Sequence, residues 1–325
     1  MKITIFIGVI LWSLCSFAQG PYAPAAEQAG TSAIHKDSSI IIAWAKTCTV
    51  TRGYQDIANP NLGRSSVGDS TSALGIAQTS GVVSLGDSGF ATVTFDATIY
   101  DGPSWDFVVY ENGFEAAGGG DYLELAFVEV SSDGQNFFRF PSHSLSDTSQ
   151  SIGGFGTLDP TNLNNLAGKY LLSYGTPFDL NELSGIQGLN INAISHIRIV
   201  DVVGSINQNH ASRDTAARKI VDPYPTPFPS GGFDLDAVGA IHMNPVGLKT
   251  NQMLVKRTYP NPVVEVLQLE ISTSEIEYQL YDNLGKRRLH GTTQGEIDLT
   301  ALEHGIYLLQ LFDGTLCQSI KVLKQ

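Results

Sequence analysis

Short apolar runs separated by turn residues are the feature that most constrains how this 325-residue chain can fold. In segments such as 90–95, apolar and polar side chains alternate, which is the period of a strand with one buried face. Helical periodicity is weak, and we expect only single turns at 163–168 and 178–183. The 33 glycines suit turns between strands, and a charged fraction of 16% does not suit coiled coils or long charged helices. We therefore expect an all-β protein.

A net charge of −13 limits the classes of partner. Nucleic-acid binding needs a basic surface that neutralises phosphates, so a chain with a pI near 4.8 is not expected to bind nucleic acid. Most of the acidic residues precede residue 258, so the acidity belongs to the larger, central part of the chain. A cation, a neutral ligand or a role on an outer surface remains compatible with this charge.

Residues 1–18 combine one lysine, an apolar run, and small residues at Ser16 and Ala18. This pattern predicts a secretory signal peptide that is cleaved after Ala18. The apolar run is shorter than the ~20 residues that a membrane span needs, and we expect no transmembrane segment after its removal. Cys48 and Cys317 then remain, without metal-type spacing, and we expect two free thiols.

Residues 258–325 contain four motifs in a fixed order. They are Tyr259-Pro260-Asn261-Pro262, the turn segment at 280–286, Gly305-Ile306-Tyr307-Leu308, and a basic-ended last strand. The strand spacing predicts a small Ig-like β-sandwich. The order of motifs resembles the C-terminal sorting domain of the type IX secretion system of Gram-negative Bacteroidetes. The resemblance implies handling by the type IX machinery, removal of the tail, and display on the outer-membrane surface or release. An ordinary Ig-like module is the alternative, and residues 248–257 are expected to form a linker.

Residues 19–247 are expected to form one jelly-roll-like β-sandwich, the domain that carries the function. The predicted strands lie at 81–86, 90–95, 105–111, 123–130, 137–140, 197–203 and 233–241. Stretches at 106–114, 124–134 and 222–238 resemble a family of secreted bacterial cell-surface proteins without an assigned activity. That resemblance implies an extracellular location and a compact β domain, and it supplies no catalytic residues.

Acidic residues inside apolar strands are the first candidate site. Because Asp234 and Asp236 lie two residues apart in a strand, they are expected to share one sheet face. A buried carboxylate must be paired, hydrogen-bonded or bound to a cation, and Ca²⁺ accepts six to eight oxygen ligands. The candidate Ca²⁺ ligands are Asp234, Asp236, Asp201, Glu111, Asp106 and Asn112. Two alternatives stay open, namely that some of these aspartates cap turns, or that Arg139 or Arg198 pairs with a carboxylate.

Aromatic residues on stiff or exposed segments are the second candidate site. Alternating prolines at 222–229 keep that segment extended, and they fix the positions of Tyr224 and Phe228. Such rings suit stacking on a sugar or another flat ligand. Trp44 and Trp105 are further candidates for a binding surface. The alternative for all four is packing against the sandwich.

These features predict a secreted, surface-displayed binding or adhesion protein that is stabilised by calcium and binds a glycan or small molecule. We expect binding more than enzymatic activity, because no catalytic motif is present and the seven histidines are scattered. A polysaccharide-acting enzyme is one alternative, although Glu124 and Glu129 are a poor catalytic pair because they face opposite ways on a regular strand. An accessory protein that delivers a ligand to an outer-membrane nutrient transporter is another.

Overall fold

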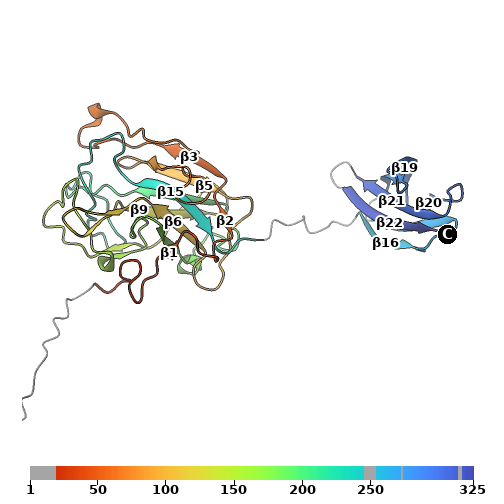
Figure 1. Ribbon diagram of the computed structural model, residues 1–325, viewed down its shortest axis with the longest axis horizontal. Coiled ribbons are helices and arrows are strands. Elements are labelled where there is room, and N and C mark those ends of the chain that lie inside the picture. Colours follow the sequence, from red (N-terminus) through yellow and green to blue (C-terminus); the bar gives the residue numbers. More distant parts are fainter. Residues whose placement is uncertain (1–19, 245–253, 272–273, 314–316) are drawn as a thin grey trace, which may run out of the picture. The chain divides into compact units, whose positions relative to one another are not determined.

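The computed structural model describes residues 20–244, 254–271, 274–313 and 317–325. The predicted signal peptide lies outside these residues. The chain divides into two compact units, Met1–Val246 and Gly247–Gln325, and each is described by itself (Figure 1). No helix in the described ranges is long and apolar enough to cross a membrane.

The first unit is a β-sandwich of two antiparallel sheets. One sheet has the order β1 (Ile34–His35), β13 (Tyr174–Phe178), β6 (Phe107–Glu111), β15 (Asp234–Ala240) and β2 (Ala43–Trp44), and β4 (Val83–Ser84) also pairs with β15. The other has the order β10 (Phe138–Arg139), β9 (Ala126–Ser131), β14 (His196–Asp201), β5 (Phe90–Thr94) and β3 (Thr47–Thr51). The chain crosses repeatedly from one sheet to the other, and the predicted all-β sandwich is confirmed.

The core forms because alternate side chains of the central strands point between the sheets. Phe107 and Val109 of β6 meet Val128 of β9 and Ile199 of β14 there. The intervening residues of β6 face outward, but a second apolar cluster that includes Ile34 covers them. Every residue of β6 is therefore buried.

Short elements and loops complete the first unit. Two small hairpins pair β7 (Phe114–Glu115) with β8 (Asp121–Tyr122), and β11 (His143–Ser144) with β12 (Leu163–Asn164). The 3₁₀ turns are η1 (Pro60–Leu62), η2 (Pro160–Asn162) and η3 (Leu180–Leu183).

The two predicted helical turns differ in outcome. Residues 180–183 form η3, where the Asp179 side chain accepts a hydrogen bond from the Asn181 N–H. The turn predicted at 163–168 is wrong, because η2 ends just before Leu163 and the chain then pairs with β11 as a strand.

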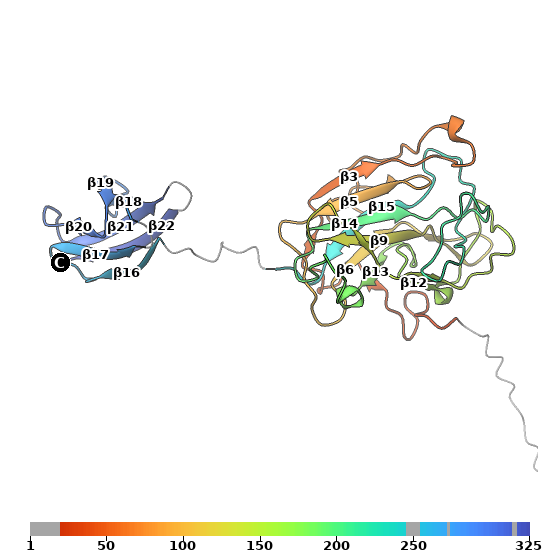
Figure 2. The ribbon, with the colours of Figure 1, turned by 180° about the vertical axis from the view of Figure 1, so that it is seen from behind.

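The second unit also consists of two packed antiparallel sheets (Figure 2). A three-stranded sheet has the order β16 (Val255–Tyr259), β17 (Val266–Ile271) and β20 (Glu296–Asp298). A four-stranded sheet has the order β19 (Arg287–Thr293), β18 (Ile276–Tyr281), β21 (Gly305–Phe312) and β22 (Cys317–Lys324). β16 begins inside the segment that we predicted as linker; Leu254 just before it is buried, and 248–253 lie outside the described residues.

Strand ends from both sheets meet at one end of the first unit. β6 ends at Glu111, which lies opposite Leu235 near the start of β15, and β14 ends at Asp201, opposite the start of β9. The Phe233 N–H, just before β15, donates to Asp201 Oδ1 at 2.8 Å and ties the two sheets together. We call this region the acidic end, because five buried carboxyl groups gather there, from Glu111, Glu124, Asp201, Asp222 and Asp234.

Candidate functional site

Two carboxylates of the acidic end are bound to backbone N–H groups and hold loops in place. Asp201 accepts from Phe233 and also from the Ser88 N–H at 3.0 Å. Asp222 accepts from the Leu125 N–H at 2.7 Å, next to the start of β9. Burial raises the pKa of both carboxyls well above their usual range, followed by the charge of Asp87 for Asp201 and the charge of Asp201 for Asp222.

Glu111 is less completely satisfied, and Glu124 is buried beside it. Glu111 is 1% exposed, and its Oε2 accepts from the Gly113 N–H at 2.7 Å, but its Oε1 has no hydrogen-bond partner among the described residues. Burial, followed by the charge of Asp234, raises the pKa of Glu111 well above its usual range. Glu124 is 4% exposed, and burial followed by the charge of Glu111 raises its pKa well above the usual range too.

Asp234 lies between the other carboxyls and a pair of polar side chains. Its Oδ1 accepts from the Ser84 hydroxyl, and its Oδ2 accepts from the Asn112 side-chain amide at 3.1 Å. Burial raises the pKa of Asp234 to about 6, although both hydrogen bonds and the charge of Arg52 act in the opposite direction. This carboxyl therefore changes its charge near neutral pH.

A cavity of about 370 Å³ opens above these groups. Its polar lining consists of Asn112, Glu124, Thr226, Ser230 and Asp234. Its apolar lining is entirely aromatic and consists of Phe114, Tyr122, Phe155 and Phe228. The lining contains no lysine, arginine or histidine, so its formal charge is negative or zero.

The aromatic side chains of the cavity form a continuous arc. Phe114 stacks on Tyr122 with ring centroids 4.6 Å apart, Tyr122 lies 6.4 Å from Phe155, and Phe155 lies 6.3 Å from Phe228. Phe155, Phe114 and Phe228 are 75%, 50% and 45% exposed, and they are the strongly exposed phenylalanines of the described chain. Exposed rings that gather on one cavity with buried polar groups are typical of a ligand site.

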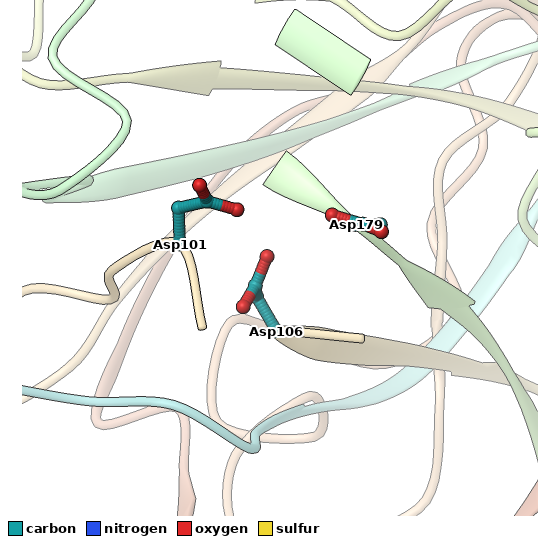
Figure 3. A group of neighbouring side chains, drawn as sticks. All are labelled: Asp101, Asp106 and Asp179. Carbon is teal, nitrogen blue, oxygen red and sulfur yellow. The ribbon is translucent and has the colours of Figure 1, made fainter. Parts of the chain in front are cut away.

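A second group of carboxyls lies elsewhere in the first unit. Asp101, Asp106 and Asp179 each offer an oxygen, and these oxygens all lie within 4.8 Å of one another (Figure 3). Asp106 accepts from the Leu180 N–H at 2.7 Å and bonds to His242 Nδ1 at 2.8 Å. Asp101 Oδ1 is buried and has no partner in the described structure. An orphaned oxygen beside two more carboxylates fits a hard cation such as Ca²⁺.

The six predicted metal ligands fall into three places. Asp106 belongs to the group with Asp101 and Asp179. Glu111, Asn112, Asp201 and Asp234 lie at the acidic end, and Asp236 lies further along β15, where its charge still raises the pKa of Glu111. Both oxygens of Asp236 accept from the Gln78 N–H, at 2.9 and 3.0 Å. The structure therefore does not bring the six together around one ion.

Of the four predicted ligand-binding aromatics, Phe228 lines the cavity. Tyr224 is buried, and its hydroxyl donates to Asp56 Oδ1 at 2.9 Å. Trp105 packs against the apolar cluster outside β6. Trp44 lies 5.5 Å from the Tyr110 ring and lines a separate groove of about 750 Å³. That groove is larger, but it lacks buried carboxyls and exposed rings.

Sequence reasoning missed Phe114, Tyr122 and Phe155, and it set Glu124 aside. Glu129, with which Glu124 was compared, pairs instead with Arg139 (2.7 Å) and Arg198, as one of the alternatives anticipated. The position of Glu124 just before an apolar strand was the available signal for it. The three rings come from loops and short hairpins whose meeting depends on the tertiary fold.

Comparison with known proteins identifies the second unit. Residues 257–325 match the secretion system C-terminal sorting domain. The tail is a sorting domain. The protein is therefore handled by the type IX secretion machinery, and it is a secreted or cell-surface protein of a Bacteroidetes-type bacterium.

Other comparisons add no assignment for the first unit. No curated protein matches the chain. A β-glucuronidase from Ruminococcus gnavus in complex with uronic deoxynojirimycin is 8% identical, with a TM-score of 0.20, over 86% of this chain and 44% of that chain. A β-glucuronidase from Lactobacillus rhamnosus is 10% identical, with a TM-score of 0.18, over 86% and 45%. The chain spans less than half the length of these enzymes, and similarity this low carries no argument.

Proposed function

We propose that the first unit is a surface-displayed binding module whose cavity at the acidic end takes a glycan or another small ligand. The observation that carries this proposal is the gathering of Phe114, Phe155 and Phe228 around one cavity. A folded chain gains nothing by exposing three rings to water together, whereas a ligand that covers them removes apolar surface from water. The sorting tail supplies the route to the outside.

The cavity has the two kinds of group that hold a sugar. Aromatic faces pack against the C–H faces of a pyranose ring, and they lose little side-chain entropy when they do so. Asn112, Thr226 and Ser230 offer donors and acceptors for hydroxyl groups, and Glu124 and Asp234 add further acceptors. The arc of rings would fix the position of the ligand, and the polar floor would select its orientation.

A glycan microarray probed with the mature full-length chain and with its Phe155→Ala variant tests this function. We expect the wild-type protein to bind at least one glycan class, and we expect the variant to lose that signal. Phe155 is the most exposed of the three rings, so its removal leaves the fold intact. Ile186→Ala, an exposed apolar residue that does not line the cavity, is the matched control. Absence of binding to any glycan or small-molecule probe would contradict the proposal.

We also propose that Ca²⁺ stabilises the first unit, held by Asp101, Asp106 and Asp179. Three carboxylates provide the charge that a hard divalent cation needs, and backbone carbonyls and water would complete its shell. The expected result is a higher melting temperature in millimolar Ca²⁺ than in EDTA, and the shift should disappear in Asp101→Asn. The exposed Asp96→Asn is the control and should keep the shift. An identical melting temperature in Ca²⁺ and EDTA would contradict the site.

Enzymatic action on a polysaccharide is the second candidate, and one observation favours it. Glu124 and Asp234 line the same cavity, and both have raised pKa values, as a general acid requires. Release of reducing sugar from an array-positive glycan, lost in Glu124→Gln, would establish the enzyme and replace the binding function. Binding without release would leave the binding function standing.

A further inference from the structure

We propose that the cavity at the acidic end selects a sugar that carries a free amino group, through recognition of its ammonium ion. The inference rests on the proposed function and names the ligand class for the same site. The observation behind it is that one cavity combines an arc of aromatic rings with the carboxyl groups of Glu124 and Asp234, and that its lining has no basic side chain.

The carboxyl groups around the cavity have little local compensation from basic side chains. The lining contributes Glu124 and Asp234, and behind them lie Glu111, Asp201 and Asp222. None of these five carboxylates is in a salt bridge between described residues, in contrast to Glu129 and its two arginines. Buried carboxylates normally have a cationic partner, and here a ligand can supply it.

Arg52 is the basic residue whose charge acts on Asp234, and its guanidinium is already occupied. It donates to backbone carbonyl oxygens of Val67 (2.8 Å), Gly68 (2.5 Å) and Ser84. These bonds hold Arg52 against a loop, and Arg52 does not line the cavity. An ammonium group that enters the cavity therefore meets carboxyls without a competing cation in the wall.

Glu111 provides an independent sign that a positive group is missing. Its Oε1 is buried without a hydrogen-bond partner among the described residues, its charge raises the pKa of Glu124, and the charge of Asp234 raises the pKa of Glu111 itself. An unpaired buried carboxylate oxygen costs free energy, and a cation nearby reduces that cost. A neutral sugar would not supply this positive charge.

The aromatic arc is equally suited to a cation. The faces of aromatic rings carry negative electrostatic potential, and this potential attracts a cation placed over a ring. Phe155 and Phe228 are exposed and line the cavity, so an amino sugar could lay its ring on them while its amine reaches Glu124 or Asp234. Ligands that carry carboxylates, such as uronic acids, would be repelled by the same floor.

The test compares two ligands that share a sugar skeleton and differ at the amino group. Isothermal titration calorimetry of the mature full-length protein at pH 7 would use a glucosamine tetrasaccharide and its fully N-acetylated counterpart. Acetylation removes the positive charge and keeps the sugar skeleton. We expect the amine form to bind at least ~10-fold more tightly, as a charge-assisted hydrogen bond and a cation–π contact together imply. Raising the salt concentration should weaken only the amine form.

Variants locate the effect within the cavity. Glu124→Gln should reduce the preference for the amine to less than ~3-fold, because a neutral amide replaces the carboxyl group that would pair with the ammonium ion. Glu115→Gln, an exposed glutamate on β7 that does not line the cavity, is the matched control and should keep the full preference. Amine selection is tested by comparing the two ligands on the wild-type protein. This comparison does not depend on whether a variant folds.

The outcomes separate this inference from the function on which it rests. Equal or tighter binding of the N-acetylated sugar, lost in Phe155→Ala, overturns amine selection and leaves a glycan-binding cavity. Failure of both sugars, of every glycan on the array and of every small-molecule probe overturns the proposed function as well. Binding of choline together with failure of every sugar would overturn the amino-sugar assignment.

Discussion

The charge state of Asp234 makes a quantitative prediction about stability. Its pKa is about 6 in the folded protein, mainly through burial, against an ordinary value of 3.8. Between these values the native state keeps a proton that the unfolded chain releases, so stability falls as pH rises through this window. Each pKa unit corresponds to about 1.36 kcal/mol, so the full effect is about 3 kcal/mol, of which about 2 kcal/mol falls between pH 4 and pH 7.5.

The substitution Asp234→Asn isolates this effect. Asparagine resembles the protonated carboxyl and can still bond to Ser84 and Asn112, so the variant should match the wild type at pH 4. At pH 7.5 the variant should be more stable by about 2 kcal/mol, because it no longer buries a charge. Asp87 and Asp236 also have raised pKa values, but the charge of Asp234 is not among the causes, so they titrate alike in both proteins and their contribution cancels in the difference.

Tryptophan fluorescence during urea unfolding, in EDTA, is the appropriate assay. After loss of the predicted signal peptide, the remaining tryptophans are Trp44 and Trp105, so the signal reports the first unit alone. Asp96→Asn, an exposed aspartate, controls for a change in net charge. If Asp234→Asn destabilises the protein more at pH 7.5 than at pH 4, the carboxylate is stabilised in its ionised form and the reasoning is wrong.

Three further predictions concern other parts of the chain. Glu129→Gln should lower the free energy of unfolding by about 2–3 kcal/mol, because it leaves two arginines without their buried partner. In the same urea assay, substitution of the exposed Glu115 by Gln should change it by less than about 0.5 kcal/mol. Gly168→Ala should weaken ligand binding and lower the melting temperature, because a Cβ there would lie 1.8 Å from the Glu124 carbonyl oxygen and φ is +80°; unchanged binding would show that this contact does not position Glu124. Residues 247–325 fused to a periplasmic reporter should carry it to the cell surface in a type IX-competent host, and a reporter that stays in the periplasm would contradict the role of the tail.

Regular strands could be predicted from the sequence because their burial pattern is local. β5 falls within the predicted 90–95, and β6 falls within the predicted 105–111. Two-residue strands such as β1 and β2 have no such pattern, because pairing with long neighbours creates them.

Residues of the candidate site could be predicted only where they depart from the local sequence pattern of a strand or loop. Asp234 and Asn112 are polar residues at the ends of apolar strands, and Phe228 lies in a proline-stiffened loop, so each stood out in the sequence. Phe155 lies in a glycine-rich loop far along the chain from Phe114, and no local pattern indicates that the two rings meet. Glu124 was judged as part of a regular strand, whereas β9 begins at Ala126, after it.

Hydrogen–deuterium exchange of the mature protein with a bound, array-positive glycan shows directly whether the cavity at the acidic end is the binding site. We expect slower exchange in 112–124, 152–156 and 226–234, the segments that carry the cavity lining. Exchange around Trp44, which lines the other groove, should stay unchanged. Protection confined to the Trp44 groove or to the sorting tail would contradict the assignment of the cavity at the acidic end as the binding site.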